Sequence, residues 1–295
     1  MPIDKTSMLW PIKSGLVRTW SELKFQLRLA NAAERTLPQF LIIGSQKGGT
    51  TSLYAYLCQH PDIKAAFNKE IHYFDYGFVQ GEQWYRAHFP KHKALDPDSQ
   101  KGPRTITGEA TPCYMQHPFA ARRIRELLPD VKLIAILRNP IDRAFSHYKM
   151  MSVRKDFERL SFEEAIEAEP DRLAADLAEL QRNEFARAEF HQRASYISRG
   201  FYYEQLLQFD DYYKSGQLLV LSSEDLFANP QAAFDQTLEY LGLRPFNLQD
   251  CTPQNQGQGA YYADQIKTET LQKLTELYNS HNEKLYDYIG RDMNW

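Results

Sequence analysis

The amino-acid sequence predicts an α/β protein with a mostly parallel central sheet and helices on both of its faces. Short apolar runs suited to buried strands, such as 40–43 and 131–137, alternate with segments whose apolar residues recur at helical spacing. The first apolar run leads into a glycine-rich turn and then a helix. This order predicts a three-layer, P-loop-like fold, with one domain over residues 37–295.

The glycine-rich turn has the composition of an anion-binding loop. Residues 44–49 contain three glycines around Lys47, and three hydroxyl residues follow, any of which can cap the next helix. Backbone N–H groups at a helix start, together with a lysine, favour a phosphate. The turn is not a Walker A loop, because its lysine precedes the glycine pair instead of following it. The residues expected to contact the anion are Lys47, Gly48, Gly49, Thr50, Thr51 and Ser52.

Residues 1–36 are predicted to form a helical extension. Leu16, Val17, Trp20, Leu23 and Leu27 fall near helical spacing, with basic residues between them. We interpret this segment as a helix that packs its apolar face on the domain. The alternative is a helix that lies on a membrane surface or docks a partner.

The segment 69–74, KEIHYF, carries a carboxylate and an imidazole close together. If 70–74 is extended, Glu70 and His72 share one face, because side chains alternate along a strand. Such a pair can transfer protons. The alternative is a solvated edge strand with two polar residues.

The strands after this segment carry polar residues at their carboxyl ends, where α/β proteins usually bind ligands. Glu109 follows a short strand at 105–108, and Arg138 follows the buried strand 131–137. Ser146 lies two turns into the next helix, 141–151, which has Pro140 near its start. Arg138 is read either as a structural ion pair or as a bidentate phosphate clamp.

The other expected elements are mainly helical. Residues 152–195 are expected to form a helical insertion, in which one helix starts at Ser161. The other expected helices are 51–59, 118–128, 195–213, one beginning at 223, 231–241 and 264–289. A strand is expected at 217–222, and a polar loop at 250–263.

Composition excludes several classes of protein. The net charge of −3 and the pI near 6.3 provide no general basic field for nucleic acid. No apolar stretch approaches the roughly 18–20 residues of a membrane span, and no secretory leader is evident, so we expect a cytoplasmic protein. The three cysteines are widely spaced, which predicts reduced thiols and no metal site.

Four segments resemble the PAPS-dependent sulfotransferases, PAPS being 3′-phosphoadenosine 5′-phosphosulfate. They are SQKGGTTS (45–52), KEIHYF (69–74), GEATPCY (108–114) and LRNPIDRAFSHY (137–148). The resemblance implies that Arg138 and Ser146 hold the 3′-phosphate of PAPS. KEIHYF is similar to the heparan-sulfate and bacterial branch of the family, which implies Glu70 as the catalytic base. Relatives often carry a Lys-Gly-Arg loop over the nucleotide, and here Gln256, Gly257 and Gln258 stand in that place.

The resemblance implies an enzyme that transfers a sulfuryl group from PAPS to a hydroxyl and releases adenosine 3′,5′-bisphosphate (PAP). Lys47 would stabilise the leaving oxygen and Glu70 would take the acceptor proton. His72 would orient Glu70, help to bind the acceptor, or replace Glu70 as base. The alternatives are a P-loop-like nucleotide kinase, which the missing Gly-Lys-(Ser/Thr) order disfavours, and a non-catalytic phosphonucleotide-binding module.

The sequence leaves the acceptor and the oligomeric state open. A carbohydrate, a lipid, a small natural product and a carrier-bound β-hydroxyacyl chain all fit the family. The net acidic chain and the uncharged 256–258 loop argue against a long polyanionic glycan, which would need a basic groove.

Overall fold

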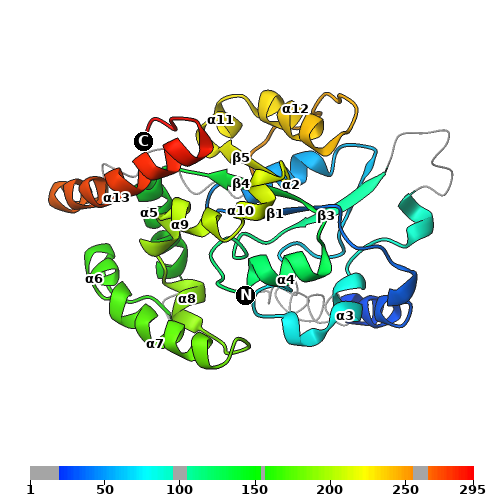
Figure 1. Cartoon of the computed structure of the whole chain (residues 1–295), viewed down its shortest axis with the longest axis horizontal. Helices are drawn as coiled ribbons and strands as arrows, with labels where there is room; N and C mark the ends of the chain where they lie inside the picture. The colour runs from blue at the N-terminus through cyan, green and yellow to red at the C-terminus, as the bar shows by residue number, and fades with distance from the viewer. Residues whose placement is uncertain (1–19, 96–104, 154–156, 255–264) are drawn as a thin grey trace, which may run out of the picture.

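The central sheet has the parallel arrangement that the sequence predicts. A computed structural model describes residues 20–95, 105–153, 157–254 and 265–295. In these residues five strands pair in the order β2-β3-β1-β4-β5, every neighbouring pair is parallel, and β1 lies at the centre (Figure 1). The strands are β1 (Phe40–Gly44), β2 (Ile63–Ala65), β3 (Ile106–Ala110), β4 (Lys132–Leu137) and β5 (Leu218–Ser222).

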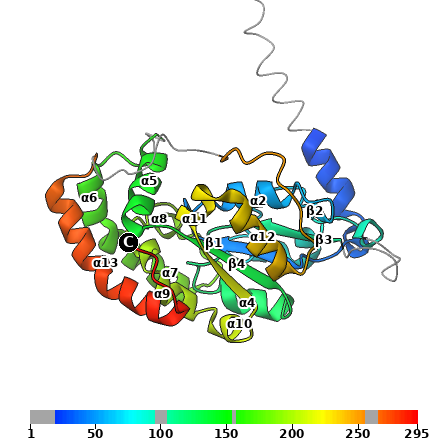
Figure 2. The same cartoon turned by 90° about the horizontal axis from the view of Figure 1, so that it is seen from above.

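Helices cover both faces of the sheet. Because side chains alternate along β1, Phe40 and Ile42 enter one apolar core, and Leu41 and Ile43 enter the other. The first core is covered by α2 (Thr50–Leu57), α11 (Ser223–Ala228) and α12 (Pro230–Leu241). The second is covered by α4 (Ala120–Leu127), α9 (Tyr202–Leu207), α10 (Asp210–Lys214) and the end of α13 (Thr268–Ile289). Figure 2 shows α2 and α12 on one side of the sheet and α4 and α10 on the other, which confirms the three-layer prediction.

The helices expected after β4 are present. They are α5 (Pro140–Ser152), α6 (Phe162–Glu167), α7 (Glu169–Arg182) and α8 (Glu189–Arg193). Ser161 starts α6 with the predicted capping box, in which its side chain bonds Glu164 N and Glu164 bonds back. A third core, which includes Phe145, Phe162 and Tyr278, joins the insertion to α5 and α13. The domain boundary between 1–36 and 37–295 stays a prediction.

The single helix expected over 195–213 is wrong. The chain forms η4 (Ser198–Gly200), α9 and α10 instead. Gly200 lies so close to Tyr278 of α13 that a Cβ there would be 2.6 Å from the tyrosine hydroxyl. Packing against α13 therefore outweighs the local helix propensity of this segment and breaks it into shorter elements. The remaining short elements are η1 (Ala32–Glu34), η2 (Phe78–Gln80), α3 (Glu82–Arg86) and η3 (His92–Leu95).

The extended conformation expected for residues 70–74 is also wrong. Glu70 and His72 have positive φ angles of 56° and 57°, so strand alternation does not apply to them. The N–H groups of Glu70 and Tyr73 donate to the Ala110 carbonyl and the Tyr114 hydroxyl, and not to a strand ladder. Contacts with residues far away in the sequence thus set this conformation. The strand that does form nearby, β2, ends at Ala65, before this segment.

The N-terminal helix packs with the opposite face from the one predicted. Residues 20–29 are helical, but Trp20, Leu23 and Leu27 are exposed by 60%, 50% and 62%. The face that contacts the domain carries Phe25 and Arg28, whose guanidinium donates to the carbonyls of Ala87 and Phe89. Leu16 and Val17 lie outside the described residues. Among the described helices, none is both long and apolar enough for a membrane span, and the cytoplasmic location stays a prediction.

Gly108 of β3 provides a test of the sheet packing. A Cβ at this position would lie 2.5 Å from the ring of Phe40, its partner on β1. Phe40 is fully buried, so the ring has no space to move into. We expect Gly108→Ala to lower the free energy of unfolding by about 1–3 kcal/mol in urea denaturation.

The double variant Phe40→Leu/Gly108→Ala is the control for this prediction, because leucine removes the ring atoms that clash. The two substitutions should be non-additive, and the double variant should lose less stability than the sum of the singles. Strict additivity would show that the clash does not exist.

Candidate active site

A tightly folded loop, residues 44–49, leaves β1 and is called the phosphate loop below. The Ser45 backbone N–H and Oγ both donate to the Ile136 carbonyl of β4, at 2.8 and 2.9 Å. A Cβ on Gly48 would lie 2.5 Å from that carbonyl oxygen, so the position needs glycine. The loop is thereby fixed against the end of β4.

The helix that follows this loop begins without a side-chain cap among the described residues. Gly49 is the N-cap, with φ of 103°, so the expected cap by a hydroxyl residue is wrong. The Ser52 hydroxyl instead accepts a hydrogen bond from Gln254 N at 2.9 Å. The first N–H groups of α2 and the positive end of its dipole therefore suit a bound anion.

Two cations meet at the phosphate loop. The Arg138 guanidinium donates to the Lys47 carbonyl at 3.3 Å, and the Arg138 carbonyl accepts the Tyr202 hydroxyl at 2.8 Å. Burial and the charge of Arg138 lower the pKa of the Lys47 ammonium, whereas the charge of Glu70 raises it. A bound phosphate or sulfate group is an anion and would stabilise the charged forms of both Lys47 and Arg138.

Ser146 belongs to the helix that starts directly after Arg138. Asn139 caps α5 by accepting the N–H groups of Ile141 and Asp142, and Ser146 lies buried in the second turn. The strand end and the helix start thus place the two predicted 3′-phosphate residues on one β4–α5 junction.

Residues 69–75, called the acceptor-side loop below, bring Glu70 close to the phosphate loop. The side chain of Glu70 is 46% exposed and forms an ion pair with Lys69 at 2.5 Å. Glu70 is near enough to Lys47 to raise the pKa of that ammonium. The structure therefore brings together the predicted base and the predicted cation, although not through a strand face.

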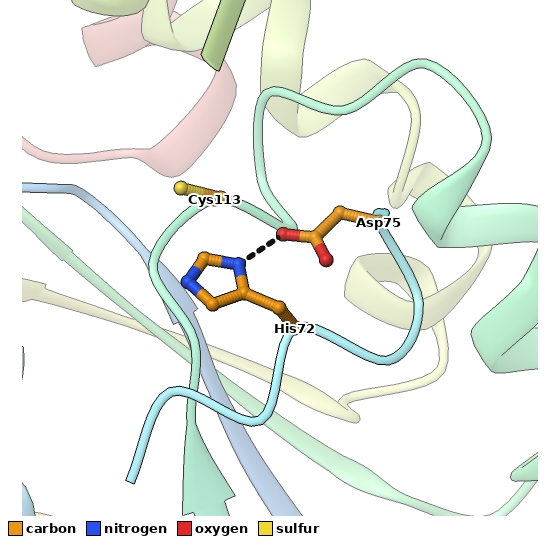
Figure 3. Close-up of side chains that lie close together, drawn as sticks. All are labelled: His72, Asp75 and Cys113. Carbon is orange, nitrogen blue, oxygen red and sulfur yellow. Dashed lines mark hydrogen bonds and ion pairs between the residues drawn. The ribbon is translucent and has the colours of Figure 1, made fainter. Parts of the chain in front are cut away.

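His72 forms a hydrogen-bonded pair with Asp75, which the sequence interpretation missed. The distance from His72 Nδ1 to Asp75 Oδ2 is 2.6 Å, and Nε2 points away from Asp75 (Figure 3). Burial lowers the pKa of His72, but the hydrogen bond and charge of Asp75 outweigh it, so the pKa is raised overall. The sequence signal that could have indicated this pair is the spacing of three residues between His72 and Asp75.

Cys113 lies beside this pair. Donor atoms of His72, Asp75 and Cys113 all lie within 4.8 Å of one another, and these residue types can bind zinc (Figure 3). Burial raises the pKa of the Cys113 thiol to about 11, and His72 Nδ1 is already bonded to Asp75. The described side chains thus form a hydrogen-bonded His72–Asp75 pair beside a thiol whose raised pKa favours its neutral form.

Arg199 links the helical insertion to the phosphate loop. Its Nη1 donates to Gln46 Oε1 at 2.5 Å, and its Nη2 donates to the Gln192 carbonyl at 2.6 Å. Arg199 is 3% exposed. No local sequence signal predicts a contact across 153 residues.

Two other predicted features are placed differently or not described. Glu109, expected beside the ligand after its strand, is fully buried within β3. Gln256, Gly257 and Gln258 lie outside the described residues. The segment before them is tied to α2, because Tyr56 donates its hydroxyl to the Cys251 carbonyl at 2.8 Å.

Comparisons with known proteins agree with the site. A family model for the sulfotransferase domain matches residues 37–284. Heparan sulfate glucosamine 3-O-sulfotransferase 3B1 of Mus musculus is 31% identical in an alignment 290 residues long, which covers 90% of this chain and 67% of the relative. The membrane-associated sulfotransferase kil1 of Dictyostelium discoideum is 26% identical over 323 residues, covering 88% of this chain and 66% of the relative. The chain thus spans about two thirds of the length of these relatives.

A solved structure is similar over nearly its whole length. The crystal structure of a sulfotransferase from Alicyclobacillus acidocaldarius aligns with a TM-score of 0.64 and 26% identity, covering 88% of this chain and 98% of that chain. The fold, the phosphate loop and the family match together confirm the resemblance found in the sequence: this chain belongs to the sulfotransferase family, whose members transfer sulfuryl groups.

Proposed function

We propose that this chain transfers the sulfuryl group of PAPS to an acceptor hydroxyl between the phosphate loop and the acceptor-side loop. The observation that carries the proposal is the convergence of Lys47, Arg138 and the uncapped start of α2 around one loop. Together they suit a ligand with several negative charges. PAPS is such a ligand, and PAP would be the product.

Each group at the phosphate loop has a role in this proposal. Lys47 stabilises the charge that develops on the leaving oxygen, and Arg138 with Ser146 holds the 3′-phosphate. Backbone groups of the loop and of the α2 start hold the 5′-phosphosulfate. The positive charge comes from the protein itself, so we propose that the reaction uses no metal ion.

On the acceptor side we propose Glu70 as the base. Against the effect of burial, the hydrogen bond and charge of Asp75 raise the pKa of His72, and His72 Nδ1 is already bonded to Asp75 at 2.6 Å, so we assign His72 a supporting role. Glu70 is half-exposed, ionisable and close to Lys47. His72 then orients Glu70 or the acceptor.

The acceptor is proposed as a hydroxyl group of one of four classes: carbohydrate, lipid, small natural product or carrier-bound β-hydroxyacyl chain. One relative is a sulfotransferase of heparan sulfate glucosamine, which supports a carbohydrate. The net charge of −3 favours a short or weakly charged saccharide over a long polyanion. A screen of the four classes with labelled PAPS identifies the acceptor.

The first prediction concerns the base. Glu70→Gln keeps the shape of the side chain but cannot take a proton, so transfer from labelled PAPS should fall on the order of 10²-fold or more. PAP affinity should stay within a few-fold, because the phosphate loop is unchanged. His72→Asn should lose less activity.

The assay is run in the presence of EDTA, so activity that depends on added Mg²⁺ would contradict the metal-free part of the proposal. An active Glu70→Gln protein alongside an inactive His72→Asn protein would assign the base to His72.

The second prediction concerns the 3′-phosphate. Arg138→Ala should weaken PAP binding by about 2–3 kcal/mol in calorimetry, the loss of a bidentate charged contact, and should weaken AMP binding much less. Arg125→Ala is the matched control, since Arg125 is an exposed arginine of α4 paired with Asp211. Equal losses for PAP and AMP would give Arg138 a general structural role.

The third prediction concerns the His72–Asp75 pair. Because the folded-state pKa of His72 is raised, the pair stabilises the fold fully below the unfolded pKa of about 6.5. This contribution is lost as pH rises through the folded pKa. In urea denaturation, the stability difference between the wild type and His72→Asn should therefore shrink above pH 6.5.

Asp75→Asn is the background control for this experiment. Without the carboxylate, His72→Asn should produce a difference that no longer changes in this way with pH. The same slope in the Asp75→Asn background would mean that another group raises the pKa of His72.

A further inference from the structure

The acceptor-side loop holds its two functional side chains in an unfavourable backbone conformation. Glu70 and His72 both have φ near +57°, a region that non-glycine residues rarely occupy and that costs on the order of 1–3 kcal/mol each. Such a conformation persists only where surrounding contacts enforce it. Those contacts come from the last residue of β3 and the segment that follows it.

Three N–H groups of the loop donate to this segment. The Glu70 N–H donates to the backbone carbonyl of Ala110 at 3.2 Å. The His72 N–H bonds Thr111 Oγ1 at 3.4 Å, and the Tyr73 N–H bonds the Tyr114 hydroxyl oxygen at 2.9 Å. Two of the three acceptors are therefore side-chain hydroxyls, which can rotate.

The carboxylate of Glu109 fixes the direction of these hydroxyls. Thr111 donates its proton to Glu109 Oε2 at 2.6 Å, and Tyr114 donates to Oε1 at 2.9 Å. Tyr85 donates a third hydroxyl to Oε1 at 2.7 Å. Since each hydroxyl has a single proton, its donation to Glu109 leaves the oxygen lone pairs of Thr111 and Tyr114 for the loop N–H groups.

We propose that Glu109, through Thr111 and Tyr114, is a positioning residue that holds the acceptor-side loop in the conformation needed for transfer. Glu109 is fully buried, and the described hydrogen bonds of its carboxylate go to Tyr85, Thr111 and Tyr114 and not to either loop. It acts by turning two hydroxyls into fixed acceptors. The inference deepens the proposed function, since it rests on Glu70 and His72 working on the acceptor side.

The hydrogen-bond geometry around Glu109 agrees with this role. Burial raises the pKa of Glu109, and the hydrogen bonds from Thr111, Tyr85 and Tyr114 offset this increase only in part. Three donors around one carboxyl group match the ionised form, which only accepts hydrogen bonds. A buried carboxylate is costly unless satisfied in this way, which distinguishes the network from an ordinary apolar core.

Two tyrosines offer a matched pair for the test. Tyr85 and Tyr114 are both fully buried, and each donates one hydroxyl to the same oxygen of Glu109. Only Tyr114 also accepts a hydrogen bond from the loop. Tyr114→Phe and Tyr85→Phe therefore remove the same bond to Glu109 and differ in the contact to the loop.

Four quantities are measured for both variants: melting temperature, PAP affinity, kcat for sulfuryl transfer, and hydrogen exchange of the peptide that contains the acceptor-side loop. Both variants should keep PAP affinity, and Tyr114→Phe should lose more stability than Tyr85→Phe, because the Tyr73 N–H also loses its acceptor. Tyr114→Phe should lower kcat about tenfold or more and speed exchange in the loop. Tyr85→Phe should keep kcat within about threefold of the wild type. Thr111→Val, which removes the other hydroxyl at equal volume, should behave like Tyr114→Phe.

Equal losses of kcat in Tyr114→Phe and Tyr85→Phe would overturn the proposal, and so would unchanged loop exchange in Tyr114→Phe. Hydrogen exchange does not depend on any acceptor. If the wild type transfers sulfuryl to no acceptor, the proposed function fails, while the exchange difference still decides whether the network positions the loop.

Discussion

The site depends on one electrostatic constraint, the accumulation of positive charge at the carboxyl ends of β1 and β4. The phosphate loop is bonded to β4 through Ser45, and this brings Lys47 within reach of Arg138. Two neighbouring cations and an uncapped helix start are unfavourable without an anion. Burial first and the charge of Arg138 second lower the pKa of Lys47. The fold tolerates this cost because β1 and residues 133–137 of β4 are buried in the centre of the sheet. A phosphate-bearing donor removes the cost, so binding energy is directed to the reacting group.

The strand order turns this constraint into a two-sided site. β3 and β4 flank β1, so the segments after these three strands meet at one edge of the sheet. The segments after β1 and β4 carry Lys47 and Arg138, which we propose face the sulfuryl donor, and the segment after β3 supports the acceptor-side loop with Glu70 and His72. In-line transfer needs donor and acceptor on opposite sides of the moving group, and adjacent parallel strands supply two such sides without any further domain.

The sequence predicted those parts of the fold that local chemistry determines. The apolar runs of β1 and β4 and the capping box at Ser161 each have a cause within a few residues. The conformation of the acceptor-side loop could not be predicted, because its N–H groups bond to residues about forty positions away. The N-terminal helix failed for a related reason. The helical spacing of its apolar residues could be recognised in the sequence, but the side chains that contact the domain are Phe25 and Arg28.

The helical insertion is hydrogen-bonded to the phosphate loop. Arg199 joins the Gln192 carbonyl to the Gln46 side chain through two short bonds, and Arg199 itself is buried. The insertion is itself held by Glu158, whose carboxylate accepts the Tyr196 hydroxyl at 2.9 Å and pairs with Arg172 at 2.8 Å. A displacement of the insertion would therefore pull on the residue next to Lys47. Because sulfuryl transfer tolerates little change in the distance between donor and acceptor, we expect this connection to make the insertion contribute to the catalytic geometry.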